Sequence, residues 1–384
     1  RWSWSTVFGM PLQYRRTVIF CSMSILQKRR SRPSSSSPDG VAPTGASPDS
    51  SPTGAASSGR RQARRAVRLL VIVLALIGAW SIGSAVMGPV GVGHFRSAEG
   101  RAAYMTAYNR AMELLPEPTA QYDIQTDYGL VRAYEWSAQQ TVQTVPVVLL
   151  PGRSSGVPMW SANLAGFAAR HRVIAFDALG DAGLSVQSSP LESFTDQAEW
   201  IDQVLDVVAP DGAHLVGHSF GGATAAAYAR IHPERVHSLA LLEPVFTFGY
   251  PPARFMAWAT IASLPGLPRG IRETALGRIG GVDYNNASDD PLAMMIESGS
   301  QYFSAELPTP SPLSQAQAAT MTMPVYVAIA GQDSLAGGQG AAARARDLLP
   351  QATVEIWPEA THSLPMQKAE ELGATLAEFW ADAE

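Results

Sequence analysis

Cysteine is nearly absent from this chain, which has only Cys21 among its 384 residues. The sequence after Cys21 therefore excludes a disulfide, a thiolate nucleophile and a cysteine-based metal site. A segment without cysteine is indifferent to the redox state of its compartment, so this composition is compatible with export.

Basic residues are also scarce after residue 68. Residues 1–68 hold 12 Lys and Arg against 2 acidic residues, whereas the remainder holds 16 against 31. Such an acidic body lacks the basic face that nucleic-acid phosphates require, so we expect no nucleic-acid partner. The sequence also lacks a P-loop, a dinucleotide fingerprint and a metal-ligand cluster. We therefore expect no cofactor and no metal.

Large apolar side chains are almost missing from residues 31–59, which consist mainly of Ser, Pro, Gly and Ala. A segment of this composition cannot bury enough surface to offset the entropy that it would lose on ordering. We therefore predict that residues 1–68 form a disordered, basic and Ser/Pro-rich tail.

Charged side chains are missing from residues 69–93. This apolar run is long enough for a helix that crosses the hydrocarbon core, for which about 20 residues suffice. Five arginines within residues 60–68 predict a cytoplasmic N-terminus, because basic residues next to a span stay on the cytoplasmic side. We expect one transmembrane helix at residues 69–93, with the cell membrane as a partner and the rest of the chain on its extracytoplasmic side.

A cleaved signal peptide is the alternative interpretation of the same run. Its densest part, from Leu69 to Trp80, has the length of a signal-peptide core, and Gly83 and Ala85 offer small residues for cleavage. The mature chain would then be secreted.

The remaining chain divides into two parts. Residues 94–119 contain an amphipathic juxtamembrane helix and a linker. Residues 120–384 begin with a hairpin, after which strands and helices alternate, and this is typical of an α/β fold whose mostly parallel sheet has helices on both faces. The expected strands after the hairpin are "VPVVLLPG", "RVIAFDALG", "AHLVGHS", "HSLALLEP", "MPVYVAIAGQD" and "ATVEIWP".

One serine stands where a predicted strand turns directly into a predicted helix. In "HLVGHSFGGATAAAYA", Ser219 lies between Gly217 and Gly221. This setting is typical of a nucleophilic serine on a strained turn, where the neighbouring backbone comes too close for a Cβ atom. The N-terminus of the following helix adds partial positive charge where an oxyanion would form. An ordinary Gly-Ser turn is the alternative.

A serine hydroxyl needs a base to take its proton, and the chain has seven histidines. Only His362 follows a late strand, at the carboxyl edge where open parallel sheets keep their sites. The other six flank the serine on its own strand, lie at the wrong ends of their elements, or lie beside residues 69–93. We therefore predict His362 as the base, against the alternative of a solvated loop histidine.

The base in turn needs a carboxylate that holds its tautomer and stabilises the imidazolium. Two acidic residues follow strands at the same edge, Asp333 at the end of "VYVAIAGQD" and Glu243 near the end of "SLALLEP". A strand, a short Gly-containing turn and then Asp is the better fit, so we prefer Asp333 and keep Glu243 as the alternative acid.

Taken together, "LLPG", "FDALGDAGLS", "GHSFGG", "GQD" and "THSLP" occur in an order that resembles the α/β-hydrolase superfamily. From about residue 120 onwards the chain looks most like bacterial serine esterases that carry a lid between strands six and seven. The resemblance implies a Ser219, Asp333 and His362 triad, with an oxyanion hole made by the backbone N–H groups of Phe220 and Arg153. The family usually has His-Gly before that second donor, whereas this chain has Pro-Gly.

The segment between the two late strands, residues 245–323, is too long for a simple loop. It contains three helical patterns, which at this place would form the lid. Its large apolar residues either line a substrate pocket or pack the lid onto the core. They are Phe255, Met256, Trp258, Met294, Met295, Tyr302 and Phe303.

These observations predict a membrane-anchored serine hydrolase that cleaves carboxylic esters, with an apolar acyl or alcohol group, through an acyl-enzyme. One alternative keeps the triad but transfers the acyl group to an alcohol or peroxide, or hydrolyses a C–C bond. The other alternative is a non-catalytic binding module on the membrane.

Overall fold

The computed structural model describes residues 91–138, 144–264, 266–282 and 289–383. The chain divides into two units, and all described residues belong to the unit that contains Val90–Glu384. The predicted tail, residues 1–68, lies outside the described residues.

The structure corrects one part of the expected fold class, the transmembrane helix. None of the helices in the described ranges is long and apolar enough to cross a membrane. The longest of them have 15 residues, whereas a span needs about 20. Of the predicted span, residues 69–90 lie outside the description, and residues 91–93 are not helical. Nothing in the described chain therefore supports the membrane partner.

The core of the fold is a mixed sheet in the order β11-β10-β8-β7-β4-β5-β3-β2. The neighbours β11, β10, β8, β7, β4 and β5 pair in parallel, as predicted. Strands β2 and β3 form the predicted antiparallel hairpin, and β3 also pairs antiparallel with β5 and β6. The strands are β2 (Ala120–Thr126), β3 (Gly129–Trp136), β4 (Val147–Leu150), β5 (Val173–Phe176), β6 (Val186–Gln187), β7 (Ala213–His218), β8 (Val236–Leu242), β10 (Val325–Ala330) and β11 (Thr353–Trp357).

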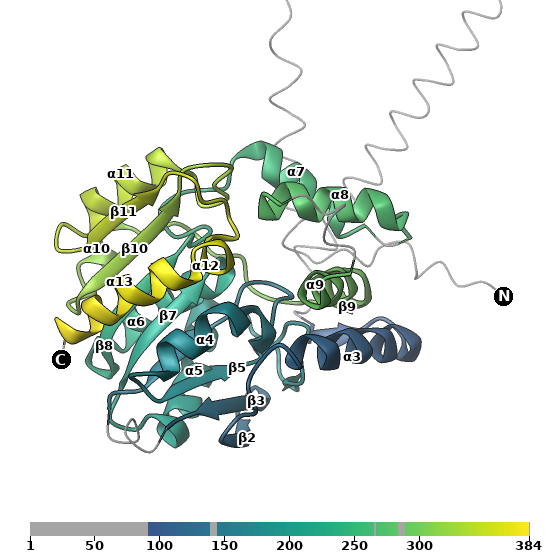
Figure 1. Cartoon of the computed structure of the whole chain (residues 1–384), viewed down its shortest axis with the longest axis horizontal. Coiled ribbons are helices and arrows are strands. Elements are labelled where there is room, and N and C mark those ends of the chain that lie inside the picture. Colours follow the sequence, from purple (N-terminus) through teal and green to yellow (C-terminus); the bar gives the residue numbers. More distant parts are fainter. Residues whose placement is uncertain (1–90, 139–143, 265, 283–288, 384) are drawn as a thin grey trace, which may run out of the picture. The chain divides into compact units, whose positions relative to one another are not determined.

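Helices cover both faces of this sheet, so its central strands are apolar on both sides. Along β4, Val148 and Leu150 belong to one buried cluster and Val147 and Leu149 to the other. The first cluster includes residues of α5 (Phe194–Val208), α6 (Phe220–Ile231) and α11 (Gln339–Leu348). The second includes residues of α4 (Ser161–Ala168) and α13 (Ala369–Ala381), which cross the other face of the sheet (Figure 1).

The segment between β8 and β10, residues 245–323, is here called the insertion. Helices form where the sequence predicted them, and α7 and α8 pack side by side (Figure 1). The buried guanidinium of Arg272 donates to the carbonyl groups of Ala262 and Leu264 and so fixes the turn between these two helices. The elements of the insertion are α7 (Ala253–Ala262), α8 (Arg269–Gly280), α9 (Pro291–Tyr302), β9 (Phe303–Ser304) and α10 (Gln315–Ala318).

The helix before the sheet, α3 (Ala98–Met112), packs along α9 of the insertion (Figure 1). Ser97 caps α3 by accepting a hydrogen bond from the N–H of Gly100. A Cβ at Gly100 would stand 2.9 Å from the Tyr302 side chain, so the two helices approach closely there. Strand β1 (His94–Phe95) pairs antiparallel with β9 beside them. The segment predicted as a juxtamembrane helix and linker thus packs on the insertion.

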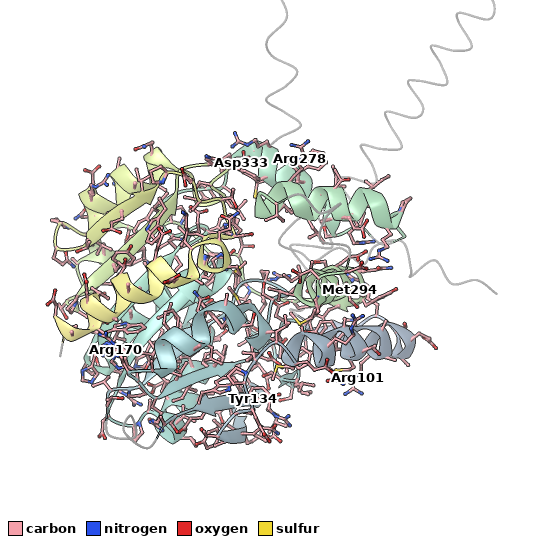
Figure 2. All side chains as sticks on the ribbon, in the orientation of Figure 1. Arg101, Tyr134, Arg170, Arg278, Met294 and Asp333 are labelled. Carbon is pink, nitrogen blue, oxygen red and sulfur yellow. The ribbon has the colours of Figure 1, made fainter. Side chains whose placement is uncertain are left out.

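Truncating a side chain in the α3–α9 contact should destabilise the fold. Met295 is fully buried in a cluster with Tyr104 and Tyr108 of α3, so Met295→Ala should lower the free energy of unfolding by about 2–4 kcal/mol. The neighbouring Met294, which is labelled in Figure 2 and only partly buried, supplies a matched Met294→Ala control that should cost less than about 1 kcal/mol. Urea denaturation measures both values, and equal losses would contradict the packing.

Candidate active site

The serine turn has the strained conformation that the sequence predicted. Strand β7 ends at His218, α6 begins at Phe220, and Ser219 between them has φ 56° and ψ −119°. A Cβ at Gly217 would lie 2.5 Å from the carbonyl oxygen of Gly221, and one at Gly221 would lie 2.3 Å from that of Leu150. Backbone atoms cannot give way as a flexible side chain can, so both positions require glycine.

His362 lies beside Ser219 in the turn after β11. Its Nε2 accepts a hydrogen bond from the Ser219 hydroxyl at 2.9 Å. Its backbone carbonyl accepts one from His218 Nε2–H, also at 2.9 Å. The imidazole is therefore fixed both through its ring and through its main chain, in reach of the serine proton.

The carboxylate that contacts His362 belongs to Glu243, directly after β8. Its Oε2 accepts the Nδ1–H of His362 at 3.1 Å. The same carboxylate accepts the N–H of Ala330 and the hydroxyl of Ser334, each at 2.7 Å, and the N–H groups of Leu335 and Ala336. Glu243 has no exposed surface, and these contacts offset the cost of burying a carboxylate.

The expectation that Asp333 contacts His362 is corrected by this geometry. The Asp333 side chain is 61% exposed and pairs with Arg254 of α7 at 3.3 Å. Figure 2 places Asp333 next to α7 at the edge of the molecule. The reason lies in the turn after β10, where Asp333 has φ 41° and faces outward. The next residue, Ser334, faces Glu243 instead.

The two backbone N–H groups that the resemblance implied for an oxyanion hole belong to Phe220 and Arg153, and this role stays a prediction. Phe220 is the first residue of α6, and Arg153 follows Gly152, whose Cβ would stand 3.2 Å from Cβ of Ser219. Within the described residues, neither the N–H of Phe220 nor that of Arg153 donates to a protein acceptor. Both donors are thus available to a ligand beside Ser219.

Two buried aspartates hold the loop that carries Arg153. Asp181 accepts the N–H of Ser154 at 2.7 Å, and Asp177 accepts the N–H of Val157 at 3.0 Å. Asp177 also accepts the hydroxyl of Tyr108 from α3 at 2.8 Å, and burial raises the pKa of Asp177. The segment "FDALGDAGLS" contributed to the family resemblance, but the sequence assigned no role to its two aspartates. Their partners lie far away in the sequence, and no local pattern signals such contacts.

The insertion contacts the loops of this site. The Gly280 carbonyl at the end of α8 accepts the hydroxyl groups of Thr361 and Ser363, the two neighbours of His362. On α9, a Cβ at Gly299 would lie 3.2 Å from Cβ of Ser154, next to Arg153. The insertion therefore borders both the histidine loop and the loop after β4.

The apolar residues of the insertion differ in their surroundings. Phe255 and Met295 are buried in packing, which favours the alternative that they hold the insertion to the core. The other five are half-buried, and their part in a substrate pocket stays a prediction. Among the described residues, no group of three His, Cys, Asp or Glu side chains could hold a metal ion.

Comparison with known proteins agrees with this geometry. A family model described as the alpha/beta hydrolase fold matches residues 145–276. Two proteins of Bacillus subtilis (strain 168) are similar in sequence. The uncharacterized carboxylesterase nap is 31% identical over 145 residues, which are 38% of this chain and 47% of that protein. Carboxylesterase YbfK is 28% identical over 154 residues, 40% of this chain and 51% of that protein. The chain thus spans about half the length of these curated relatives.

The fold is shared more widely than the sequence. The crystal structure of carboxylesterase CesB (YbfK) from Bacillus subtilis matches with a TM-score of 0.67 at 23% identity, over 74% of this chain and 99% of that chain. The strand order and the strained serine turn after β7 are those of the alpha/beta hydrolase fold. Residues 145–276 match the model of that family, and two of the chain's relatives in sequence are carboxylesterases.

Replacing His218 should make the fold less sensitive to acid. Burial, with a smaller contribution from His362, lowers the pKa of His218 from 6.5 to about 3. Between pH 6.5 and 3, the His218 imidazole binds a proton in the unfolded chain but stays neutral in the folded chain. The contribution of His218 to the free energy of unfolding is therefore complete above pH 6.5 and is lost as the pH falls towards 3, by about 1.4 kcal/mol for each pH unit.

His218→Gln removes this titration and keeps a donor for the His362 carbonyl. Urea denaturation at several pH values between about 7.5 and 4.5 measures the effect. The free energy of unfolding should fall more steeply for the wild type, by about 1.4 kcal/mol per unit below pH 6. Parallel curves for the two proteins would contradict the assignment.

Proposed function

We propose that this protein is a serine carboxylesterase in which Ser219 is the nucleophile, His362 the general base and acid, and Glu243 the carboxylate that orients His362. The observation that carries this proposal is the continuous chain of contacts from Ser219 Oγ through the His362 ring to Glu243, at 2.9 Å and 3.1 Å. The carboxylesterase relatives support the choice of an ester as the substrate.

In the acylation step, the Ser219 oxygen attacks the ester carbonyl carbon while its proton moves to Nε2 of His362. The carbonyl oxygen becomes an oxyanion and accepts hydrogen bonds from the N–H groups of Phe220 and Arg153. The ester C–O bond then breaks, and His362 returns the proton to the departing alcohol. The acyl group stays on Ser219 as an ester.

In the deacylation step, water attacks the acyl carbon and gives its proton to His362. The same two N–H groups hold the second oxyanion, the bond to Ser219 breaks, and His362 returns the proton to the serine oxygen. The carboxylic acid leaves. In both steps Glu243 accepts the Nδ1–H and so keeps Nε2 free to take a proton.

The insertion would select the ester in this proposal. It borders the loops of His362 and Arg153, so a substrate bound at Ser219 would lie next to the insertion. Its half-buried apolar side chains provide contacts for an apolar acyl or alcohol group.

Removing the nucleophile tests the proposal directly. Ser219→Ala should lower kcat on 4-nitrophenyl butyrate by about 10⁴-fold or more, because only substrate binding and the oxyanion hole would remain. Stability should change little, and a serine-reactive phosphonate should label the wild type but not the variant. Turnover above a few per cent of the wild-type rate would exclude Ser219 as the nucleophile.

The choice of the carboxylate is tested by two matched amide substitutions. Glu243→Gln should lower kcat by about 10³-fold or more, since the His362 tautomer and the imidazolium lose their partner. Asp333→Asn should change kcat less than about threefold, because Asp333 faces solvent and Arg254. Circular dichroism and thermal unfolding verify that both variants fold. A larger loss of kcat in Asp333→Asn than in Glu243→Gln would identify Asp333 as the carboxylate that orients His362.

A further inference from the structure

The side chain of Arg153 lies near the ring of the residue that follows Ser219 and is not used in the mechanism above. Its backbone follows Gly152, which lies against both Ser219 and the Nδ1 atom of His218. Its guanidinium carbon lies 5.6 Å from the centre of the Phe220 ring, the residue after the nucleophile. The positive charge is thus flanked by the two loops that form the oxyanion hole.

The guanidinium of Arg153 has N–H groups that are not used in hydrogen bonds within the described part of the chain. In the described part of the chain, no side-chain nitrogen of Arg153 makes a hydrogen bond, although the side chain is only 24% exposed. The Arg153 guanidinium forms an ion pair with Asp181 at 3.6 Å from Nε, a distance beyond hydrogen-bond length. Asp181 already accepts the N–H groups of Ser154 and Ala182. The outer nitrogens of Arg153 therefore keep their N–H groups for another acceptor.

Basic residues are the minority in this part of the sequence. After residue 68 the chain has 16 basic residues against 31 acidic ones. An arginine fork matches the planar, doubly accepting geometry of a carboxylate or phosphate. Partial burial beside an aromatic ring weakens competition from water and strengthens such a contact.

We propose that the guanidinium of Arg153 is a binding subsite for an anionic group of the substrate, so that this hydrolase prefers esters that carry a carboxylate or a phosphate near the scissile bond. The proposal rests on the proposed esterase function and adds its substrate class. The competing view is that Arg153 only packs over Phe220 and balances the charge of Asp181.

Two pairs of esters separate these views and the two kinds of anion. For the carboxylate, 4-nitrophenyl hemiglutarate is compared with 4-nitrophenyl pentanoate, which has the same number of acyl carbons and no charge. For the phosphate, 1-butyrylglycerol 3-phosphate is compared with 1-butyrylglycerol. The measured quantity is the ratio of kcat/KM for the anionic ester to that for its neutral partner. This ratio cancels any effect of the Arg153 charge on the oxyanion that all esters share.

The wild type should prefer the anionic member of at least one pair, and high salt should reduce this preference. In Arg153→Gln the ratio for that pair should fall at least about tenfold, mainly through a higher KM, because a charged hydrogen-bond partner is lost. Arg153→Lys, which keeps the charge without the fork, should restore part of the ratio. Arg170→Gln, an exposed arginine that Figure 2 shows away from α7 and α8, should leave it unchanged.

Equal ratios in the wild type and in Arg153→Gln for both pairs would overturn the subsite and support simple packing. A fall of the same size in Arg170→Gln would also overturn it, since the preference would then follow net charge. The Ser219→Ala variant tests the proposed esterase function independently of the subsite. Turnover of every ester above a few per cent of the wild-type rate in Ser219→Ala would reject the esterase site itself, whereas intact dependence on Ser219 with unchanged ratios rejects only the subsite.

Discussion

The buried carboxylate of Glu243 is the group on which the geometry of the site depends. It accepts five hydrogen bonds, from one N–H at the end of β10, two in the following loop, the Ser334 hydroxyl and the ring of His362. A buried carboxylate without these partners would destabilise the fold by several kcal/mol. This penalty keeps each hydrogen-bond donor in position. Because β8, β10 and β11 are neighbours in the sheet, their carboxyl ends reach one carboxylate. One side chain therefore sets the positions of three segments that are far apart in the sequence.

The backbone at Ser219 is held by close packing of the neighbouring backbone and by hydrogen bonds to the adjacent turn. Ser219 and Glu243 both have positive φ, which costs about 1–3 kcal/mol for each residue. Hydrogen bonds between the adjacent turns keep them there: Ser219 N–H donates to the Leu242 carbonyl, and Val245 N–H donates to the Ser219 carbonyl. The two strained turns thus brace each other, and glycines on either side of Ser219 let the backbones approach. The strain persists because the surrounding parallel strands leave no room for it to relax.

The fold and part of the candidate site could be predicted from local sequence patterns. The serine turn could be predicted because its glycines, the strand before it and the helix after it are contiguous, and His362 because only it follows a late strand. The choice between Asp333 and Glu243 could not be made in this way, since both follow adjacent parallel strands at one edge. It depends on the direction of a single turn, in which Ser334 rather than Asp333 faces inward. The transmembrane element of the expected fold class had no counterpart among the described helices, which are too short.

Elements outside the sheet contact the loops of the candidate site. The end of α8 holds both neighbours of His362 through one carbonyl, and α9 packs against the loop that carries Arg153. The same loop is held by Asp177, whose partner Tyr108 lies on α3, outside the segment that the family model matches. A shift of the insertion would therefore move the base and one oxyanion donor together. In the proposed function, a change of substrate preference on this scaffold would be easier through single side chains such as Arg153 than through the helices that hold these loops.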